Sequence, residues 1–144
     1  MKNIAILTSG GDAPGMNACI RAVVRTAVNK GVNVFGIQYG YQGLIEDNIK
    51  ALSNKDVGNT IHVGGTILKT ARSDEFRTKS GRDKAFSILK KNKIDGLIVL
   101  VGDGSLTGAK IFYEENKFPI IGIPCTIDND LYGTNYSIGF ASAR

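Results

Sequence analysis

Short apolar runs alternate along this chain with longer segments in which apolar residues recur at helical spacing. The short runs predict buried strands over residues 3–8, 33–38, 96–101 and 119–123. The longer segments predict amphipathic helices over residues 16–30, 80–93 and 106–115. Ser53 is predicted to cap a further short helix over residues 53–62.

Strands that alternate with helices indicate βαβ units. The pattern therefore predicts an α/β fold, with a Rossmann-like, doubly wound, mainly parallel sheet between helix layers. Residues 39–47 are predicted to form a loop with Gly40 and Gly43 as turn residues, and residues 124–133 a polar loop. Residues 136–144 resemble the start of another helix, so we expect one lobe of a two-domain fold.

Composition narrows the class of protein. The chain has 144 residues, 42% hydrophobic and 22% charged, which is the composition of a globular domain. No apolar run approaches the roughly 18 residues of a membrane-spanning helix, and the first residues lack the apolar stretch of a signal peptide. Cys19 and Cys125 form no metal-ligand pattern, which favours reduced thiols. We therefore expect a cytoplasmic protein with no membrane partner.

The net charge of +5 is concentrated in one segment. Residues 69–93 contain nine basic and three acidic side chains, so this segment carries +6 and the rest of the chain −1. An excess of basic side chains favours an anionic partner, either nucleic acid or a phosphorylated small molecule. The alternative is a solvated helix face.

Glycine-rich or acidic polar segments follow three of the predicted strands, at the edge where doubly wound sheets bind ligands. The first is GGDAPGMN over residues 10–17, whose glycines and following helix N-terminus suit a phosphate. It has neither the spaced glycines of a dinucleotide fingerprint nor the Gly-Lys-Ser/Thr ending of a P-loop. A tight strand-to-helix turn is the alternative.

Carboxylates follow the next two of these strands. Asp103 lies between two glycines, where a carboxylate can hold Mg²⁺ against substrate phosphates, and Ser105 can cap the next helix. Asp128 and Asp130 can divide labour, because one can accept a proton from an attacking hydroxyl while the other works near the metal. Ordinary polar turns are the alternative for both segments.

A fourth motif, GGTILKTAR over residues 64–72, overlaps the start of the basic segment. Arg72 and Arg77 could stabilise a transferring phosphoryl group by bidentate hydrogen bonds, and surface ion pairs are the alternative. The one histidine, His62, has no partner in the pattern and is predicted to be structural. Cys125 lies inside a candidate site without an activating base, so we expect a small neighbour rather than a nucleophile.

Four of these motifs, in this order and at this spacing, resemble the N-terminal half of the bacterial ATP-dependent 6-phosphofructokinases. They are TSGGDAPGMN (residues 8–17), GGTILKTAR (64–72), GDGS (102–105) and PCTIDND (124–130). The similarity is continuous from Ile4 to Phe140. It implies a glycolytic kinase that uses Mg²⁺ and transfers the γ-phosphoryl group of ATP to the 1-hydroxyl of fructose 6-phosphate.

The resemblance also implies roles for single residues. The catalytic residues would be Asp128 as general base, Thr126, Asp130 and Arg72. The residues that contact fructose 6-phosphate would be Thr126, Ile127 and Asp128, and Asp103 would hold the Mg²⁺. The ATP-binding residues would be Gly11, Tyr41, Arg72, Ser73, Gly102, Asp103, Gly104 and Ser105.

Members of this family also bind an allosteric nucleotide or phosphoenolpyruvate at a subunit interface, and a homotetramer is implied. The matching positions are Arg21, Ala22, Val23, Val24, Arg25, Asn54 and Lys55. Arg21 and Arg25 are four residues apart, so a helix places both on one face. Asn54 stands where a third effector arginine is often found, which leaves the identity of the effector open.

Other departures from the family pattern concern the phosphate donor and the glycines. Gly104 and Cys125 stand where pyrophosphate-dependent relatives tend to carry Asp and Lys, so both favour ATP. Val101 and Lys69 replace glycines that are common in the family, and Ser73 replaces a frequent aromatic residue near the nucleotide. Family members are much longer. Residues 1–144 would then be an N-terminal ATP-binding domain that lacks the substrate domain and is inactive alone.

Two other classes of protein remain open. Another kinase of the wider superfamily, such as an NAD or diacylglycerol kinase, would share the Gly-Gly-Asp-Gly-Ser/Thr loop, although TIDND and GGDAPGMN argue against it. A non-catalytic, nucleotide-binding regulatory domain is the other. Phosphates of small molecules are the expected partners of Arg72 first, and then of Arg21 and Arg25. The lysines over residues 79–93 are expected to form a solvated helix face, so nucleic acid is not needed to explain the basic charge.

Overall fold

The central strand of the molecule is the first one in the sequence. The computed structural model describes residues 1–10, 15–58, 66–101 and 106–124, and its sheet has the strand order β3-β2-β1-β4-β5. The strands are β1 (Asn3–Ser9), β2 (Asn33–Ile37), β3 (Ile49–Leu52), β4 (Gly96–Val101) and β5 (Ile120–Pro124). Every neighbouring pair is parallel except β2 and β3, which are antiparallel. The predicted mainly parallel sheet is confirmed.

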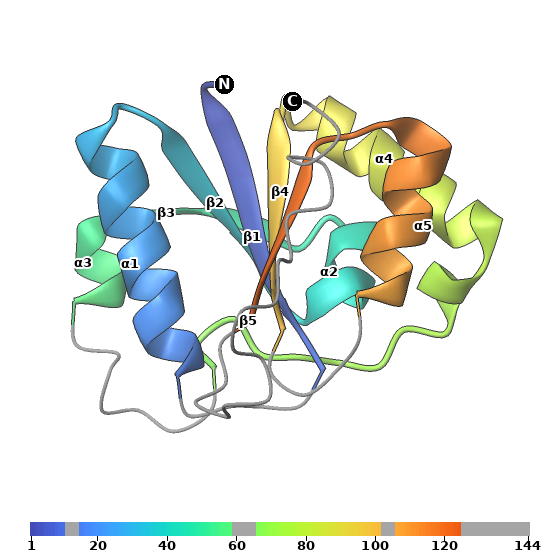
Figure 1. Cartoon of the computed structure of the whole chain (residues 1–144), viewed down its shortest axis with the longest axis horizontal. Coiled ribbons are helices and arrows are strands. Elements are labelled where there is room, and N and C mark those ends of the chain that lie inside the picture. Colours follow the sequence, from blue (N-terminus) through green and yellow to red (C-terminus); the bar gives the residue numbers. More distant parts are fainter. Residues whose placement is uncertain (11–14, 59–65, 102–105, 125–144) are drawn as a thin grey trace.

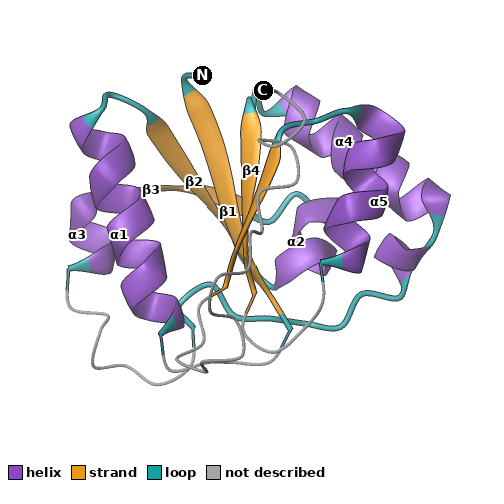
Figure 2. Ribbon diagram, viewed as in Figure 1, coloured by secondary structure: helices purple, strands orange, loops and turns teal. Residues whose placement is uncertain are grey.

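Helices cover both faces of this sheet, as the doubly wound pattern predicts (Figures 1 and 2). One layer contains α1 (Met16–Asn29) and α3 (Asn54–Val57). The other contains α2 (Gly40–Ile45), α4 (Lys79–Lys91) and α5 (Thr107–Asn116), together with the 3₁₀ turn Glu75–Arg77. Gly31, with φ at 74°, follows α1 as the expected terminating glycine.

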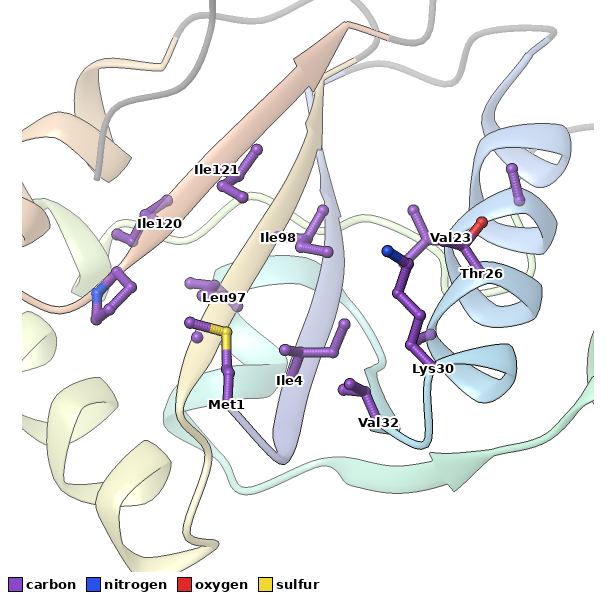
Figure 3. A pocket seen from close by; sticks show the side chains of 14 residues that line it. Met1, Ile4, Val23, Thr26, Lys30, Val32, Leu97, Ile98, Ile120 and Ile121 are labelled. Carbon is purple, nitrogen blue, oxygen red and sulfur yellow. The ribbon is translucent and has the colours of Figure 1, made fainter. Parts of the chain in front are cut away.

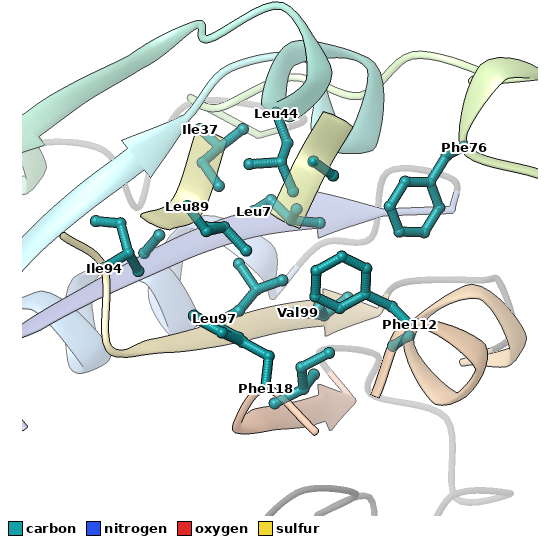
Figure 4. Close-up of a cluster of buried hydrophobic side chains, with 14 of the residues drawn as sticks. Leu7, Ile37, Leu44, Phe76, Leu89, Ile94, Leu97, Val99, Phe112 and Phe118 are labelled. Carbon is teal, nitrogen blue, oxygen red and sulfur yellow. The ribbon is translucent and has the colours of Figure 1, made fainter. Parts of the chain in front are cut away.

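Alternation along each strand sends side chains to one layer or the other. In β1, Ile6 packs under α1, whereas Ala5 and Leu7 face the opposite layer. The same alternation continues in β4, where Leu100 joins Ile6 and Val99 joins Leu7. Figure 4 shows the cluster that contains Leu7 and Val99. These two strand residues pack there with Phe76, Phe112 and Phe118, which lie outside the sheet. The core is therefore two clusters separated by one sheet.

The predicted loop over residues 39–47 is wrong. The structure has helix α2 there, and the edge strand β3 follows it. The helix was missed because its glycines resemble turn residues. At Gly43 glycine is needed for another reason, since an added Cβ would clash with the Gln38 carbonyl. Strand β3 was missed because it is a four-residue edge strand, in which Lys50 and Ala51 are exposed.

Other predicted elements agree with the structure to within about two residues at each end, which is the usual uncertainty of a helix boundary. The helix predicted over residues 53–62 is the short α3, and Ser53 does cap it. Residues 59–62 of that prediction lie outside the described residues, as do the predicted helix start at residues 136–144 and the polar loop after Pro124.

Candidate active site

The chain reverses its winding direction between β1 and β4. From β1 the chain passes through α1 to β2 on one side, whereas from β4 it passes through α5 to β5 on the other. Helices α1 and α5 lie on opposite faces of the sheet (Figure 1). The adjacent carboxyl ends of β1 and β4 therefore form a topological switch point, where open α/β sheets bind ligands.

The three chemically promising loops all start at this edge of the sheet. Ser9 and Val101, the last residues of β1 and β4, are register partners, and so are Val101 and Pro124, the last residues of β4 and β5. The three strands are parallel, so their loops leave from neighbouring points. The loop residues predicted to act lie outside the described residues: Gly11, Gly102, Asp103, Gly104, Ser105, Thr126, Ile127, Asp128 and Asp130.

A fourth segment, residues 66–72, is tied to the same edge by side chains from β1 and α1. The buried hydroxyl of Thr8 donates a hydrogen bond of 2.9 Å to the Lys69 carbonyl. Asn17, in the first turn of α1 and 2% exposed, accepts a hydrogen bond of 2.8 Å from the Ile67 amide. Buried polar groups are paired in this way to avoid a desolvation cost, so the segment is held at the switch point.

The residues that follow β2 are hydrogen-bonded to the same segment. The Tyr39 amide donates a hydrogen bond of 2.8 Å to the Leu68 carbonyl. The next residue is Gly40, with φ at 61°, where an added Cβ would lie 3.0 Å from the Thr8 carbonyl oxygen. Glycine is therefore required at residue 40, both for its backbone conformation and for the close approach of β1.

Arg72 lies at the end of this segment with its side chain in solvent. Its Nε atom pairs with the Asp74 carboxylate at 3.1 Å, and the two side chains are 75% and 76% exposed. The surface ion pair that was the alternative for Arg72 is thus present in the structure. Such exposed pairs are worth little, so the guanidinium can exchange Asp74 for a phosphate at low cost.

Tyr41 and Ser73 were both predicted to contact ATP. Tyr41 belongs to α2, and Ser73 is hydrogen-bonded to the next residue of that helix. The Tyr41 ring stacks on Phe76 with centroids 4.0 Å apart and planes 13° apart. The Ser73 hydroxyl donates to the Gln42 side chain at 2.6 Å and accepts from the Phe76 amide at 3.2 Å. Burial raises the pKa of the Tyr41 phenol, which stays protonated at neutral pH.

Phe76, the stacking partner of Tyr41, was not among the residues predicted from the sequence. An added Cβ at Gly108, in the first turn of α5, would lie 3.3 Å from the Phe76 ring, so this glycine gives the ring space. Arg82 also donates to the Phe76 carbonyl at 3.1 Å. A helix over residues 40–45 would have placed Tyr41 on the same face as the apolar Leu44 and Ile45, and therefore towards the core.

The two segments predicted to bind an effector lie side by side, because α3 packs against α1. Asn54 and Lys55 are exposed on α3, and Ala22 and Arg25 are exposed on α1. Arg21 is half-buried, and its Nε atom has no hydrogen-bond partner among the described residues. Val23 is half-buried too, whereas Val24 is fully buried in the core under α1, out of reach of a soluble ligand.

A large hollow lies elsewhere, towards the amino ends of the strands. Its volume is about 540 Å³, and it lies between α1 and the sheet. Figure 3 shows Val23 and Thr26 of α1 facing Ile4, Ile98 and Ile121. Its walls are almost entirely apolar, so it is unsuited to phosphates and separate from the candidate site.

Neither a metal-ligand cluster nor a membrane-spanning helix is present among the described residues. Residues 1–10, 15–58, 66–101 and 106–124 contain no cluster of three or more His, Cys, Asp or Glu side chains that could hold a metal ion. The predicted Mg²⁺ site therefore depends on Asp103, outside those ranges. Within them, no helix has the length and apolar character needed to cross a membrane.

Comparison with known proteins identifies a family. The sequence pattern of the family described as phosphofructokinase matches residues 3–144. The ATP-dependent 6-phosphofructokinase of Cytophaga hutchinsonii is 54% identical over 99% of this chain, and that of Clostridioides difficile is 57% identical over 99%. The chain spans 44% of the length of each of these relatives.

Solved structures agree with the sequence comparison. The phosphofructokinase of Pichia pastoris in its T-state matches 99% of this chain with a TM-score of 0.82 and 44% identity, and the match covers 17% of the yeast chain. A pyrophosphate-dependent phosphofructokinase from Nitrosospira multiformis matches 96% of the chain and 37% of its own length, with a TM-score of 0.78. That second protein is 19% identical, so its similarity concerns the fold alone.

Proposed function

Because the chain belongs to the phosphofructokinase family, we propose that the protein of which it forms part transfers the γ-phosphoryl group of ATP to the 1-hydroxyl of fructose 6-phosphate. The products are ADP and fructose 1,6-bisphosphate. The observation that carries the proposal is the switch point. Two glycine-bearing loops and the TIDND loop leave parallel strands at one edge, where residues 66–72 are also anchored. The identities of 54–57% to proteins named for this reaction support the substrates.

In the proposed reaction Asp128 accepts the proton of the sugar 1-hydroxyl. The hydroxyl oxygen forms a bond to the γ-phosphorus as the bond from that phosphorus to the β–γ bridging oxygen breaks, and ADP leaves with that oxygen. When bound, Mg²⁺ neutralises phosphate charge, and Asp103 is the residue proposed to hold it. Thr126 and Ile127 contact the sugar phosphate, and Asp130 supports both metal and substrate.

The described residues fit the nucleotide side of this proposal. Arg72 has its guanidinium in solvent and only a weak partner, so it is available to the phosphates. Tyr41 and Ser73 both contact Phe76, Tyr41 by ring stacking and Ser73 by a hydrogen bond from the Phe76 amide. The proposed nucleotide site combines these three residues with Gly11 and the loop of residues 102–105, where Gly104 leaves room for ATP.

Regulation and assembly are proposed on the same basis. Arg21 and Arg25 on α1, with Lys55 on the adjoining α3, would bind the phosphates of a nucleotide or phosphoenolpyruvate. The complete protein would be a cytoplasmic homotetramer, with an effector site at a subunit interface. The buried Val24 would support this site from beneath, without touching the ligand.

The test is turnover of the complete protein and of its Asp128→Asn variant, with fructose 1,6-bisphosphate measured directly. We expect kcat to fall by about 10²- to 10⁴-fold, the usual contribution of a general base, while ADP binding is kept. Asp83→Asn is the matched control, because Asp83 is an exposed carboxylate on α4 that pairs with the exposed Lys79. This control should keep wild-type turnover, and residues 1–144 alone should give none.

A substrate panel covers the other classes. If the complete protein phosphorylated NAD or a lipid but no sugar phosphate, the proposal would be overturned in favour of another kinase of the superfamily. If it bound ADP but phosphorylated none of these acceptors, the regulatory domain would stand.

A further inference from the structure

Three lysines of this chain have the left-handed backbone conformation that favours glycine. They are Lys69, Lys93 and Lys117, with φ at 61°, 58° and 53°. Two of them have an ordinary explanation, since Lys93 follows the end of α4 and Lys117 is the C-terminal cap of α5. Helices commonly end in this conformation. Lys69 follows no helix and needs a different explanation.

Hydrogen bonds hold the backbone of Lys69 and of the two residues before it. Its amide donates to the Thr66 carbonyl at 3.1 Å, and its carbonyl accepts from the Thr8 hydroxyl at 2.9 Å. The Leu68 carbonyl accepts a hydrogen bond from the Tyr39 amide, and the Ile67 amide donates one to the Asn17 side chain. Contacts with β1, α1 and the end of β2 therefore impose the left-handed conformation. Lys69 is held beside Thr8, two residues before the glycine loop begins at Gly10.

The side chain of Lys69 is not used by the part of the fold that the structure describes. Lys69 is exposed, and its ammonium forms no ion pair or hydrogen bond with the described residues. By contrast, Lys79, Lys84 and Lys91 each pair with a carboxylate. Glycine would adopt this turn without strain, so packing gives no reason for a lysine here.

We propose that Lys69 binds a phosphate group of a substrate at the switch point, in addition to Arg72. The inference rests on the proposed function. An exposed, unpaired ammonium on a turn that is anchored at the carboxyl end of β1 supplies a positive charge whose position is set by the backbone. The phosphate could belong to the nucleotide or to the sugar, and the two are distinguished by the kinetic constants below.

The experiment uses the complete protein with four variants. Lys69→Met removes the charge, Lys69→Arg keeps it, Lys69→Gly removes both charge and backbone strain, and Lys93→Gly is the matched control for strain alone. We expect Lys69→Met and Lys69→Gly to raise KM for one phosphorylated substrate by roughly three- to tenfold, as suits a solvent-exposed charged contact. Lys69→Arg and Lys93→Gly should keep KM within about twofold of the wild type.

Stability separates binding from a structural role. Both glycine variants should raise the thermal midpoint, because they relieve a left-handed lysine. A Lys69→Gly protein that is more stable yet binds its substrate less tightly cannot owe that loss to a damaged fold. A raised KM for ATP assigns the nucleotide phosphates, and a raised KM for fructose 6-phosphate assigns the sugar phosphate. Unchanged KM values in Lys69→Met and Lys69→Gly overturn the proposal.

Failure of the proposed function is recognised separately. If the wild type does not phosphorylate fructose 6-phosphate, calorimetric binding of MgADP and of fructose 6-phosphate replaces the kinetic constants. Weaker binding of either ligand by Lys69→Met then supports the role of Lys69, and equal binding overturns it. A wild-type protein that binds neither ligand overturns both proposals.

Discussion

The two helical layers of this molecule close their faces of the sheet to different degrees. Beneath α2, α4 and α5, rings pack in a continuous series in which Tyr41 stacks on Phe76, Phe76 on Phe112, and Phe112 meets Phe118 edge-on. Beneath α1 and α3, the core is aliphatic, and the apolar hollow of about 540 Å³ stays open over β4 and β5.

Topology explains this difference better than composition does. Helix α1 connects β1 to β2 and therefore lies over that half of the sheet. Helix α5 connects β4 to β5 on the opposite face. The same layer also contains α2, from the segment between β2 and β3, and α4, from the segment between β3 and β4. Among the described residues, no helix covers β4 and β5 on the α1 side. The arrangement that creates the switch point thus also leaves the hollow.

The largest expected effect concerns the ion pair that closes the aromatic layer. Arg82 of α4 binds Glu115 of α5 through two hydrogen bonds of 2.7 and 3.0 Å, and the two side chains are 11% and 21% exposed. Arg82→Met leaves a half-buried carboxylate and the Phe76 carbonyl without their donor. We expect a loss of about 2–4 kcal/mol in the free energy of unfolding, measured with urea.

A matched control for this ion pair lies on the same helix. Lys79 pairs with Asp83 at 3.1 Å, but the two side chains are 68% and 55% exposed. Lys79→Met should therefore cost no more than about 0.5 kcal/mol. Equal losses in the free energy of unfolding for the Arg82 and Lys79 variants would mean that burial does not distinguish the two ion pairs. The Arg82–Glu115 pair would then not stabilise the aromatic layer more than a surface pair does.

The second prediction compares neighbouring residues of β4 that face different layers. Val99 is fully buried under the aromatic layer, whereas Ile98 is half-buried and lines the hollow. In the 144-residue chain, Val99→Ala should cost about 2–3 kcal/mol in urea unfolding, and Ile98→Ala only about 1 kcal/mol although it removes more atoms. A cost for Ile98→Ala equal to or above that for Val99→Ala would show that the hollow is covered in solution.

The fold was predictable where one physical signal dominated. Residues 96–101 form an uninterrupted apolar run, and β4 has these same bounds. Where two signals competed, the sequence alone was insufficient. Gly40 and Gly43 resemble turn residues, yet both belong to α2, and they are glycines because neighbouring backbone passes too close for a side chain. Strand β3 depends on pairing with β2, a contact that local sequence does not contain.

The candidate site shows the same division. The sequence placed three polar loops at the carboxyl edge of one sheet, and the strand ends from which they leave do lie side by side. The stacking of Tyr41 on Phe76 and the fixing of Lys69 by Thr8 could not be predicted. The residues in each of these pairs are 35 and 61 positions apart, so only the folded chain brings them together.

The smallest expected effect is a pH-dependent change in stability. It concerns α3, in the layer of α1 and α3 that leaves the hollow open. Asp56 accepts hydrogen bonds from the amide and the hydroxyl of Ser53, at 2.7 and 3.0 Å, and these lower the pKa of its carboxyl. A lowered pKa in the folded state stabilises the protein above the ordinary aspartate pKa of about 3.9, and the benefit disappears as the pH falls through the lowered value. Asp56→Asn should therefore cost about 0.5 kcal/mol at pH 7 and progressively less below pH 4.

Thermal midpoints of the wild type and Asp56→Asn, measured between pH 7 and pH 3, check this sign. Asp47→Asn is the counterpart in the layer of α2, α4 and α5. Hydrogen bonds from Lys91 and Asn92 lower the pKa of the Asp47 carboxyl, as those from Ser53 do for Asp56. The Asp47 carboxylate connects the end of α2 to the end of α4, whereas Asp56 caps a four-residue helix. The Asp47 variant should therefore lose more at pH 7, and both differences should narrow on acidification. A difference that widened with acid would mean that these carboxyls have raised pKa values.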